Sequence, residues 1–373
     1  MKVLYISHEA SLYGAPKSLL EYVIKIKEKG IEPIVIMPDT GDLYSELDKN
    51  GVRNKIIPYC NCVYKDRYSC IEHMKYIWTN LRAMLKIRKL IIEEEIDIVH
   101  TNTMAVNVGA MAAFISKVPY VWHFREYVEE DFGYKRLQPK ITRELVKRSR
   151  CCIAVSEGIR RKYRKEYGVN SIRLYDGIEN SVYLNPVNEN FCTEDTTELL
   201  LAGTICEGKG QWDAIRSVEI LVNRGIDIHL NIVGNGYAAF ISELKTYVRK
   251  KGLMKYITFR SYTHHLQELR IQSDIVLVCS RMEAFGRVTA EAMMAGKIVI
   301  GSRSGGTLEL IGRNEERGYL YQYGHPEELA DKIQYVLMNE REVLEKEKKA
   351  QGYILASTDM DRYTDRIIKI YKK

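Results

Sequence analysis

Short apolar segments alternate with amphipathic segments in two successive series, and this alternation constrains the fold of the chain more than any other feature. The first series occupies residues 3–155, and the second begins at Leu199. Most of the apolar segments are continuous rather than apolar on one side only, which is typical of parallel strands covered by helices on both faces. We therefore predict an α/β protein with two doubly wound sheets.

The pattern also predicts where the elements lie. The expected strands are 3–7, 33–37, 96–100, 120–123 and 152–155, then 199–202, 228–233, 257–260, 275–279 and 298–300. The expected helices are 17–29, 44–50, 72–95, 106–116 and 141–150, then 211–223, 238–251, 266–272, 288–295, 326–338, 341–351 and 362–372. Periodicity lapses over 180–197, which we interpret as a linker.

Size and composition agree with two folded domains. The chain has 373 residues, more than one hydrophobic core usually organises, with 46% hydrophobic and 28% charged residues. No apolar run approaches the roughly 20 residues of a membrane span, and the first residues do not resemble a signal peptide, so we expect a cytoplasmic protein. Its eight cysteines are expected to be reduced. The cluster Cys60, Cys62, Cys70 and His73 lacks the usual zinc spacing, and we interpret it as a loop.

The positive charge is concentrated between Lys135 and Arg173. This stretch holds thirteen basic and three acidic residues, together with Tyr163 and Tyr167. It could rest on an anionic membrane surface, or it could be a solvated helical face. Nucleic acid is not favoured as a partner, because no recognised nucleic-acid module accompanies the basic residues.

The segment from Ser280 to Gly306 carries the clearest chemical signal. A buried strand ends at Cys279 and a helix begins near Val288, so residues 283–287 form the turn between them. The unpaired N–H groups of a helix start suit a phosphate, and Gly286 allows close approach. Glu283 and Glu291 can accept hydrogen bonds from sugar hydroxyls, although two solvated acids would give the same pattern. A nucleotide-sugar has both kinds of group.

With Phe285-Gly286 and the turn at Gly305-Gly306, this segment resembles the Glu-x7-Glu signature of the GT4 family of retaining glycosyltransferases. The resemblance implies the GT-B fold, in which two Rossmann-like domains face each other across a cleft and the last helix packs on the first domain. It implies an acceptor domain at 1–180 with 360–373 and a nucleotide-sugar domain at 195–358. It also implies that Glu283 contacts the transferred sugar and Glu291 the ribose. The donor diphosphate would then meet the segment Phe285, Gly286, Arg287 and Val288.

A second loop, from Gly203 to Gly210, resembles the family's diphosphate loop. Lys209 occupies the position of its lysine and is expected to stabilise charge on the leaving group. Thr204 stands where the family has an arginine, and Arg287 is our candidate to replace it. Tyr262 lies at the family's base-contacting position, so the identity of the base stays open.

In the first domain the resemblance is looser. Gly14 precedes a helix in the place of a family loop that faces diphosphate and acceptor, although a simple helix start would look the same. His123 matches a histidine that approaches the transferred sugar, and a structural histidine is the alternative. Asn102, Arg125 and Glu126 lie near strand ends and are expected to bind acceptor.

Three other motifs are interpreted as structural. Gly234 to Ala239 imitates a dinucleotide fingerprint, but no acid follows at the spacing that would hold a ribose. Asp359-Met-Asp361 precedes the last helix, where acids cap, and His264-His265 reads as an exposed loop. We expect no metal and no other cofactor.

The predicted function is retaining transfer of a hexosyl unit from a UDP- or GDP-sugar to a hydroxyl of a glycan or lipid-linked acceptor. We expect it in surface polysaccharide assembly, with the enzyme peripheral on the inner face of the membrane. A phosphorylase or sucrose-type enzyme is the alternative within the family. A nicotinamide oxidoreductase using Gly234 to Ala239 and a nucleotide-binding regulator without turnover, suggested by Thr204, are the alternatives outside it.

Overall fold

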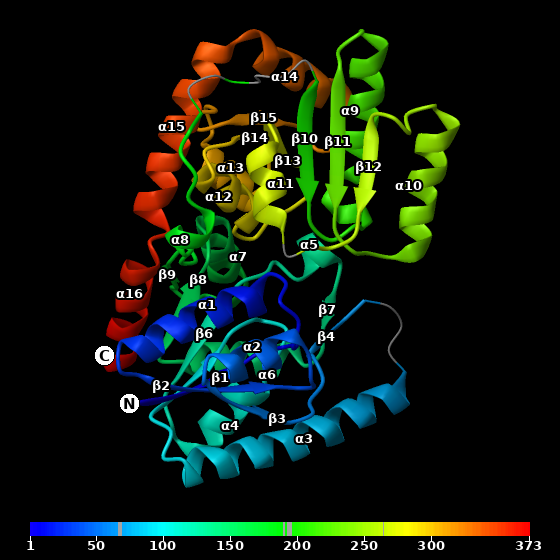
Figure 1. The fold of residues 1–373 in the computed structure, drawn as a ribbon. Helices are drawn as coiled ribbons and strands as arrows, with labels where there is room; N and C mark the ends of the chain where they lie inside the picture. Colours follow the sequence, from blue (N-terminus) through cyan, green and yellow to red (C-terminus); the bar gives the residue numbers. More distant parts are fainter. Residues whose placement is uncertain (66–68, 189–190, 192–195, 264) are drawn as a thin grey trace. The chain divides into compact units, whose positions relative to one another are not determined.

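The computed structural model describes residues 1–65, 69–188, 191, 196–263 and 265–373, and these form two compact units (Figure 1). Unit 1 comprises Met1–Ile178 and Thr358–Lys373, and unit 2 comprises Glu179–Ser357. Each unit is an α/β domain built on its own parallel sheet. Among the described residues, no helix is both long enough and apolar enough to cross a bilayer.

Unit 1 contains a seven-stranded parallel sheet. In spatial order its strands are β3 (Arg53–Ile56), β2 (Glu32–Met37), β1 (Lys2–Ile6), β5 (Ile98–Thr101), β6 (Tyr120–Phe124), β8 (Cys151–Ala154) and β9 (Ile172–Arg173). Strand β1 pairs with β2 on one side and with β5 on the other. The strand numbers rise on both sides of β1, as in a doubly wound fold. The carboxyl ends of β1, β5 and β6 therefore meet at one edge, where ligands of such sheets bind.

The helices of unit 1 cover both faces of this sheet. They are α1 (Ala15–Glu28), α2 (Asp42–Lys49), α3 (Cys70–Glu93), α4 (Val108–Ser116), α5 (Glu129–Phe132), α6 (Pro139–Arg148), α7 (Glu157–Tyr167) and α16 (Met360–Lys372). A two-stranded antiparallel pair, β4 (Val63–Tyr64) and β7 (Lys135–Arg136), lies outside the main sheet.

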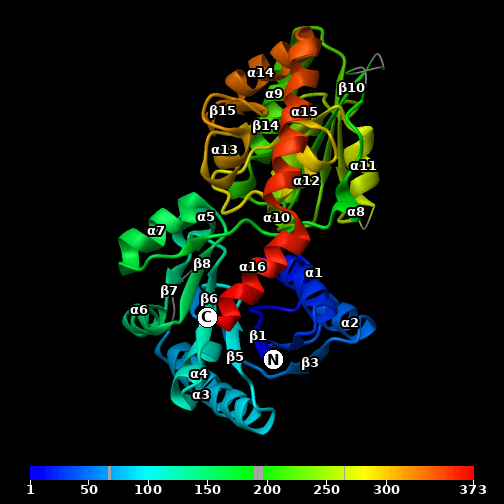
Figure 2. The same cartoon turned by 90° about the vertical axis from the view of Figure 1, so that its left-hand side faces the viewer.

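The last helix, α16, belongs to the core of unit 1. It packs beside α1 (Figures 1 and 2) and buries five side chains there, Met360, Tyr363, Ile367, Ile370 and Tyr371. Burial of a large apolar side chain contributes about 1.5–3 kcal/mol, so the helix is held firmly. Asp359 caps it by accepting a hydrogen bond from the Arg362 N–H at 2.8 Å. Both the return of this helix and the capping role of Asp359 are confirmed.

Unit 2 contains a six-stranded parallel sheet with the order 3-2-1-4-5-6 of a dinucleotide-binding fold. In spatial order the strands are β12 (Ile257–Arg260), β11 (Ile228–Val233), β10 (Thr197–Ala202), β13 (Ile275–Val278), β14 (Ile298–Ser302) and β15 (Tyr319–Tyr321). The direction of strand order reverses between β10 and β13. The loops after these two strands therefore lie at the switch point, where such folds bind ligands.

The helices of unit 2 are α8 (Asn180–Tyr183), α9 (Gln211–Asn223), α10 (Ala238–Lys250), α11 (Leu266–Gln272), α12 (Arg287–Met294), α13 (Gly305–Ile311), α14 (Pro326–Met338) and α15 (Glu340–Ser357), with a 3-10 turn, η1, at Glu207–Lys209. One apolar cluster underlies them and includes side chains from β10, β11 and β13. Most predicted elements are found within one or two residues of their expected bounds.

Some sequence predictions were wrong. The turn expected at Gly305-Gly306 is the first part of α13, and α8 forms at the start of the expected linker, part of which lies outside the described residues. Short edge strands such as β3, β9 and β15 were missed. They have two to four residues, too few for a periodicity to be recognised.

The basic stretch 135–173 is not the aromatic and basic surface that the sequence suggested. Tyr163 and Tyr167 are buried, and the Arg136 guanidinium lies over both rings. Arg136 pairs with Glu166 at 2.7 Å, and Lys162 pairs with Glu130 at 2.6 Å. The Tyr163 ring lies 4.4 Å from that of Phe124 and stacks on Tyr167, and its hydroxyl donates to the Glu126 carbonyl at 2.8 Å. Both tyrosines are therefore core residues and are not available to a membrane.

Candidate active site

The loop between β13 and α12 is held in place by the start of α13. Gly286 ends this loop with φ of 85°, a left-handed conformation that favours glycine, and no described side chain caps α12. Gly306 donates its N–H to the Glu283 carbonyl at 2.6 Å. A Cβ built at Gly305 or Gly306 would clash with the carbonyl of Glu283 or Phe285, so only glycines allow this approach. The start of α12 is thus fixed beside Glu283.

The loop that carries Lys209 docks on the same strand end. Arg281 donates its N–H to the Gly208 carbonyl at 2.8 Å, and a Cβ at Gly210 would clash with the Cys279 carbonyl. This approach brings the Lys209 ammonium to 2.5 Å from Glu283 Oε1. The two side chains are 28% and 17% exposed, so the pair can meet a ligand. Two residues predicted separately from the sequence therefore form one ion pair.

Glu291 lies in the second turn of α12 and is buried between two arginines. Its Oε2 accepts from the Arg270 guanidinium at 2.7 Å, and its Oε1 accepts from Arg287 Nε at 2.7 Å. The guanidinium of Arg287 also lies over the Tyr183 ring. A buried carboxylate needs such partners, and these two fix its orientation. Arg270 was not recognised from the sequence, because nothing in α11 marks it as the partner of a distant acid.

The turn from Gly234 to Gly236 serves the packing of unit 2. A Cβ at Gly234 would clash with the Gly203 carbonyl, and one at Gly236 with the Ile205 carbonyl. The Ile205 N–H donates to the Asn235 carbonyl at 2.9 Å, so this turn supports the loop that begins with the exposed Thr204. These contacts agree with the structural interpretation of this glycine motif, which stays a prediction.

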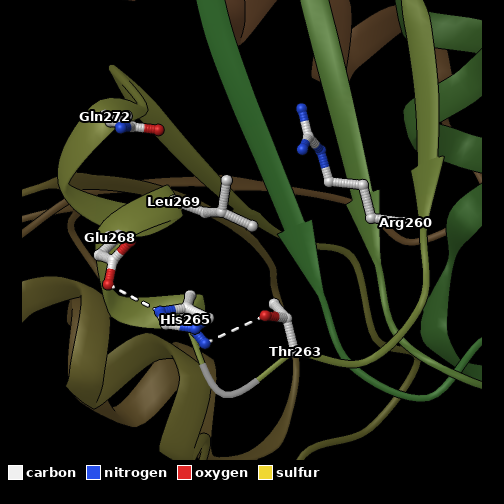
Figure 3. Close-up of a pocket in the computed structure, with 6 residues that line it drawn as sticks. All are labelled: Arg260, Thr263, His265, Glu268, Leu269 and Gln272. Carbon is white, nitrogen blue, oxygen red and sulfur yellow. Dashed lines mark hydrogen bonds and ion pairs between the residues drawn. The ribbon is translucent and has the colours of Figure 1, made fainter.

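Beyond β12 lies a shallow hollow of about 270 Å³, shown in Figure 3. It is lined by Arg260, Thr263, His265, Glu268, Leu269 and Gln272. His265 is exposed and pairs with Glu268 at 2.8 Å, as expected of an open loop, whereas His264 is outside the described residues. Tyr262 is next in the chain to Thr263, which lines the hollow. It is half-buried, and its N–H donates to Asn235 Oδ1 at 3.1 Å.

In unit 1, His123 is a buried neutral hydrogen-bond donor at the carboxyl end of β6. Its Nδ1 lies 3.4 Å from Arg125 Nη2, which can only donate, so Nδ1 accepts and the ring proton is on Nε2. Burial, reinforced by the positive Arg125, holds the pKa of His123 well below its usual value. Nε2 is buried and has no hydrogen-bond partner among the described residues. This N–H therefore has no acceptor in the part of unit 1 that the structure describes.

The tautomer of His123 is supported by a hydrogen-bond chain from the last helix. His100 Nε2 lies 3.3 Å from His123 Nδ1, and His100 Nδ1 lies 2.5 Å from the Tyr371 hydroxyl. If Nε2 of His100 donates to His123, its Nδ1 accepts from Tyr371, and burial lowers the pKa of His100 to about 3. The sequence did not reveal this chain, since Tyr371 is 271 residues from His100.

Arg125 and Asn102, predicted to bind acceptor, are buried and pair within unit 1. Arg125 Nη1 lies 2.6 Å from both oxygens of Asp176, and its Nε donates to Asn102 Oδ1 at 3.0 Å. Asn102 in turn donates to the Ala15 carbonyl at 3.1 Å. These bonds fix the start of α1 behind Gly14, which has φ of 53° and open space around its α-carbon.

Glu126 is half-buried, and it organises the loop after β5. Its carboxylate accepts from the Thr103 hydroxyl, from the Met104 N–H at 2.9 Å and from the Ala105 N–H at 3.2 Å. Burial raises the pKa of Glu126 to about 7. The acceptor-binding roles of Asn102, Arg125 and Glu126 stay predictions, and their contacts place them as supports of the loops at this edge.

Metal-type ligands do not cluster in the part of the chain that the structure describes. Cys62 packs against Tyr76 and Leu137, whereas Cys70 is exposed at the start of α3. The charged groups near α12 are instead Lys209, Glu283 and the two arginines around Glu291. An ammonium and helix amides are the positive elements there, and they suit an anionic ligand such as a phosphate.

Comparison with known protein families decides the class of the chain. Residues 13–178 match the model described as Glycosyltransferase Family 4, and residues 188–353 match the model described as Glycosyl transferases group 1. The chain belongs to the group 1 glycosyltransferases of family 4. An uncharacterised glycosyltransferase of Methanocaldococcus jannaschii is 26% identical over 84% of this chain and 89% of its own length.

Two further proteins show how this glycosyltransferase chain compares with characterised ones. N-acetyl-alpha-D-glucosaminyl L-malate synthase of Bacillus anthracis is 24% identical, over 77% of each chain. The crystal structure of Anabaena HepE in complex with UDP-glucose superposes with a TM-score of 0.82 at 20% identity and covers 99% of this chain and 98% of that one. The likeness confirms the GT-B fold, with two Rossmann-like domains.

Proposed function

We propose that the chain is a retaining glycosyltransferase that moves a hexosyl unit from a UDP- or GDP-sugar to a hydroxyl of a glycan or lipid-linked acceptor. The observation that carries this proposal is the Lys209–Glu283 pair beside the uncapped start of α12. A cation and helix amides can bind a diphosphate, and a carboxylate beside them can bind the hydroxyls of the sugar attached to it. The UDP-glucose complex of a protein with the same fold agrees with such a donor.

In the proposed reaction the acceptor hydroxyl attacks the anomeric carbon on the face from which the nucleotide leaves. The bond from that carbon to the phosphate oxygen breaks, the bond to the acceptor oxygen forms, and the hydroxyl proton passes to the departing phosphate oxygen. Lys209 and the amides of residues 286–288 stabilise the charge that develops on the diphosphate. Glu283 positions the sugar, and Glu291, oriented by Arg270 and Arg287, accepts from the ribose.

Arg287, our candidate to replace the arginine, already has partners within unit 2. Its Nε is committed to Glu291, and its guanidinium lies against Tyr183. We propose that its positive charge contributes to the field at the diphosphate, in place of the arginine that Thr204 replaces. Tyr262 is proposed to lie beside the base, since it follows β12 at the same edge of the sheet.

His123 is proposed to donate its Nε2–H to a hydroxyl of the transferred sugar or the acceptor. Its neutral state and fixed tautomer make it a donor rather than a general base. No metal is part of this proposal, in which the ammonium and the helix amides contact the diphosphate. A role in surface polysaccharide assembly, at the inner face of a membrane, is proposed from the kind of acceptor.

The test measures nucleotide release and product from UDP-glucose, UDP-N-acetylglucosamine and GDP-mannose, with chelator and with Mg²⁺. We expect transfer or slow hydrolysis of one donor in the presence of chelator. NMR of the product should show the same anomeric configuration as in the donor. Binding of nucleotides without release from any donor would instead identify a regulator, and binding of a nicotinamide dinucleotide would identify an oxidoreductase. An inverted product would contradict the retaining mechanism alone.

A further inference from the structure

Helix α3 exposes an apolar stripe that is unbroken from Ile71 to Leu85 and resumes at Ile92. The stripe consists of Ile71, Met74, Trp78, Leu81, Leu85 and Ile92, each 40–80% exposed. Their spacing of three or four residues, and then seven, places them on one side of a helix. An isolated exposed leucine needs no explanation, but six aligned large apolar side chains do.

The opposite side of α3 is firmly packed, so the stripe is not the result of a loosely docked helix. Tyr76, Ala83, Ile87 and Leu90 are buried there. A capping box between Ser69 and Glu72 fixes the first turn. Both views show α3 along the outside of unit 1, with α4 between it and the sheet (Figures 1 and 2).

Basic side chains border the stripe. At 100° per residue, Lys75, Arg82 and Lys86 lie along one side of it and Arg88 lies on the other. These four are exposed and make no ion pair with any carboxylate that the structure describes. Lys89 lies between the stripe and the three basic side chains on that side. Its ammonium is 3.5 Å from the Glu93 carboxylate.

We propose that α3 docks unit 1 on an anionic lipid bilayer, with its axis parallel to the membrane plane. The apolar stripe enters the boundary between headgroups and acyl chains, Trp78 lies at the interface, and the basic border contacts lipid phosphates. The occupant is a bilayer rather than a second copy of the chain, because two-fold pairing of this face would bring two basic borders together. The proposal rests on α3 alone and does not require the transferase reaction.

The exposed side of α3 has a stripe of apolar side chains beside its basic ones, which lipid binding needs and the stretch at 135–173 lacks. That stretch keeps exposed basic side chains, but its two tyrosines are buried. Charge without apolar side chains gives only weak, salt-sensitive attraction, whereas α3 combines both. The two surfaces can therefore be separated by substitution.

The experiment is cosedimentation of the full chain with vesicles of phosphatidylcholine, alone or with 30% phosphatidylglycerol. We expect strong binding to the anionic vesicles and weak binding to the neutral ones. Arg82→Glu/Lys86→Glu should weaken binding at least 25-fold, since each basic residue near such a surface contributes about fivefold. Trp78→Ser/Leu85→Ser should weaken it about tenfold or more through lost apolar contact.

The matched control is Arg164→Glu/Lys165→Glu on α7, which makes the same change in net charge on exposed residues of the 135–173 stretch. It should keep binding within about threefold. Equal losses in both charge variants, or wild-type protein that binds neutral and anionic vesicles alike, would overturn the proposal. The wild type could instead fail to bind vesicles and sediment as a dimer that Trp78→Ser/Leu85→Ser converts to a monomer. That result would assign the stripe to self-association. Unchanged thermal unfolding shows that each variant is folded.

Discussion

Replacing Lys209 by methionine tests the proposed chemistry of the α12 site. Methionine keeps most of the side-chain length and removes the charge that lies 2.5 Å from Glu283 Oε1. A well-placed charge-stabilising group contributes about 3 kcal/mol to the transition state, so kcat should fall about 100-fold. The pair is partly exposed, and its loss should cost at most about 1 kcal/mol of unfolding free energy.

The assay is steady-state release of nucleotide from the preferred donor, with thermal unfolding of each variant. Glu283→Gln, alone and combined with Lys209→Met, separates two roles of the lysine. If Lys209 acts on the diphosphate itself, its loss lowers kcat by a similar factor in both backgrounds. If it only orients Glu283, the double variant turns over like Glu283→Gln. Lys250→Met, on the exposed side of α10, is the control and should leave kcat unchanged. A Lys209→Met enzyme with kcat within about threefold of wild type would refute the reasoning.

Two further predictions follow from glycine packing and from a buried acid. Gly210→Ala should lower kcat tenfold or more and destabilise the fold, because its Cβ meets the Cys279 carbonyl. Gly252→Ala has the same φ of 69° but open space, so it should show only the smaller strain, and equal effects in both would contradict this. Burial raises the pKa of Glu347 to about 7 from 4.5, so its contribution to stability falls as pH rises from about 4.5 to 7. Between pH 4.5 and 7, the unfolding free energy of Glu347→Gln, measured in urea, should rise on the order of 2–3 kcal/mol relative to that of wild type. A difference between the two proteins that does not change with pH would contradict the raised pKa of Glu347.

The elements around the site were predictable because their signals are local. A continuous apolar run followed by a helical pattern identified the strand, turn and helix around Gly286. The observed start of α12 at Arg287 lies one residue from the expected one. The structural interpretation of the glycine motif at Gly234 rested on an acid that it lacks, and the close packing of Gly234 and Gly236 agrees with it.

The pairings inside the site could not be predicted, because they join residues that are far apart in the chain. Lys209 and Glu283 are separated by 74 residues, and they meet only because Gly210 lets one loop approach another strand. The burial of Glu291 between arginines and the link from Tyr371 to His100 depend on helix packing in the same way. A sequence pattern predicts that a side chain is near an edge, but not which partner it meets there.

The exposed side of α3 shows a further limit. Its amphipathic pattern correctly predicts a helix, but the stripe from Ile71 to Ile92 is as apolar as a core-facing stripe. Only the packing of Tyr76 and Ile87 shows which side is inside. In the basic stretch at 135–173 the sequence suggested exposed tyrosines, but Tyr163 and Tyr167 are core residues.

The most direct test of the central claim is a crystal structure of the chain with a non-hydrolysable UDP-sugar or GDP-sugar. We expect the diphosphate on the amides of residues 286–288, a sugar hydroxyl within about 3.2 Å of Glu283 and a ribose hydroxyl near Glu291. A nucleotide-sugar bound elsewhere, with the start of α12 closed by the chain itself and Glu283 still engaged only with Lys209, would contradict it.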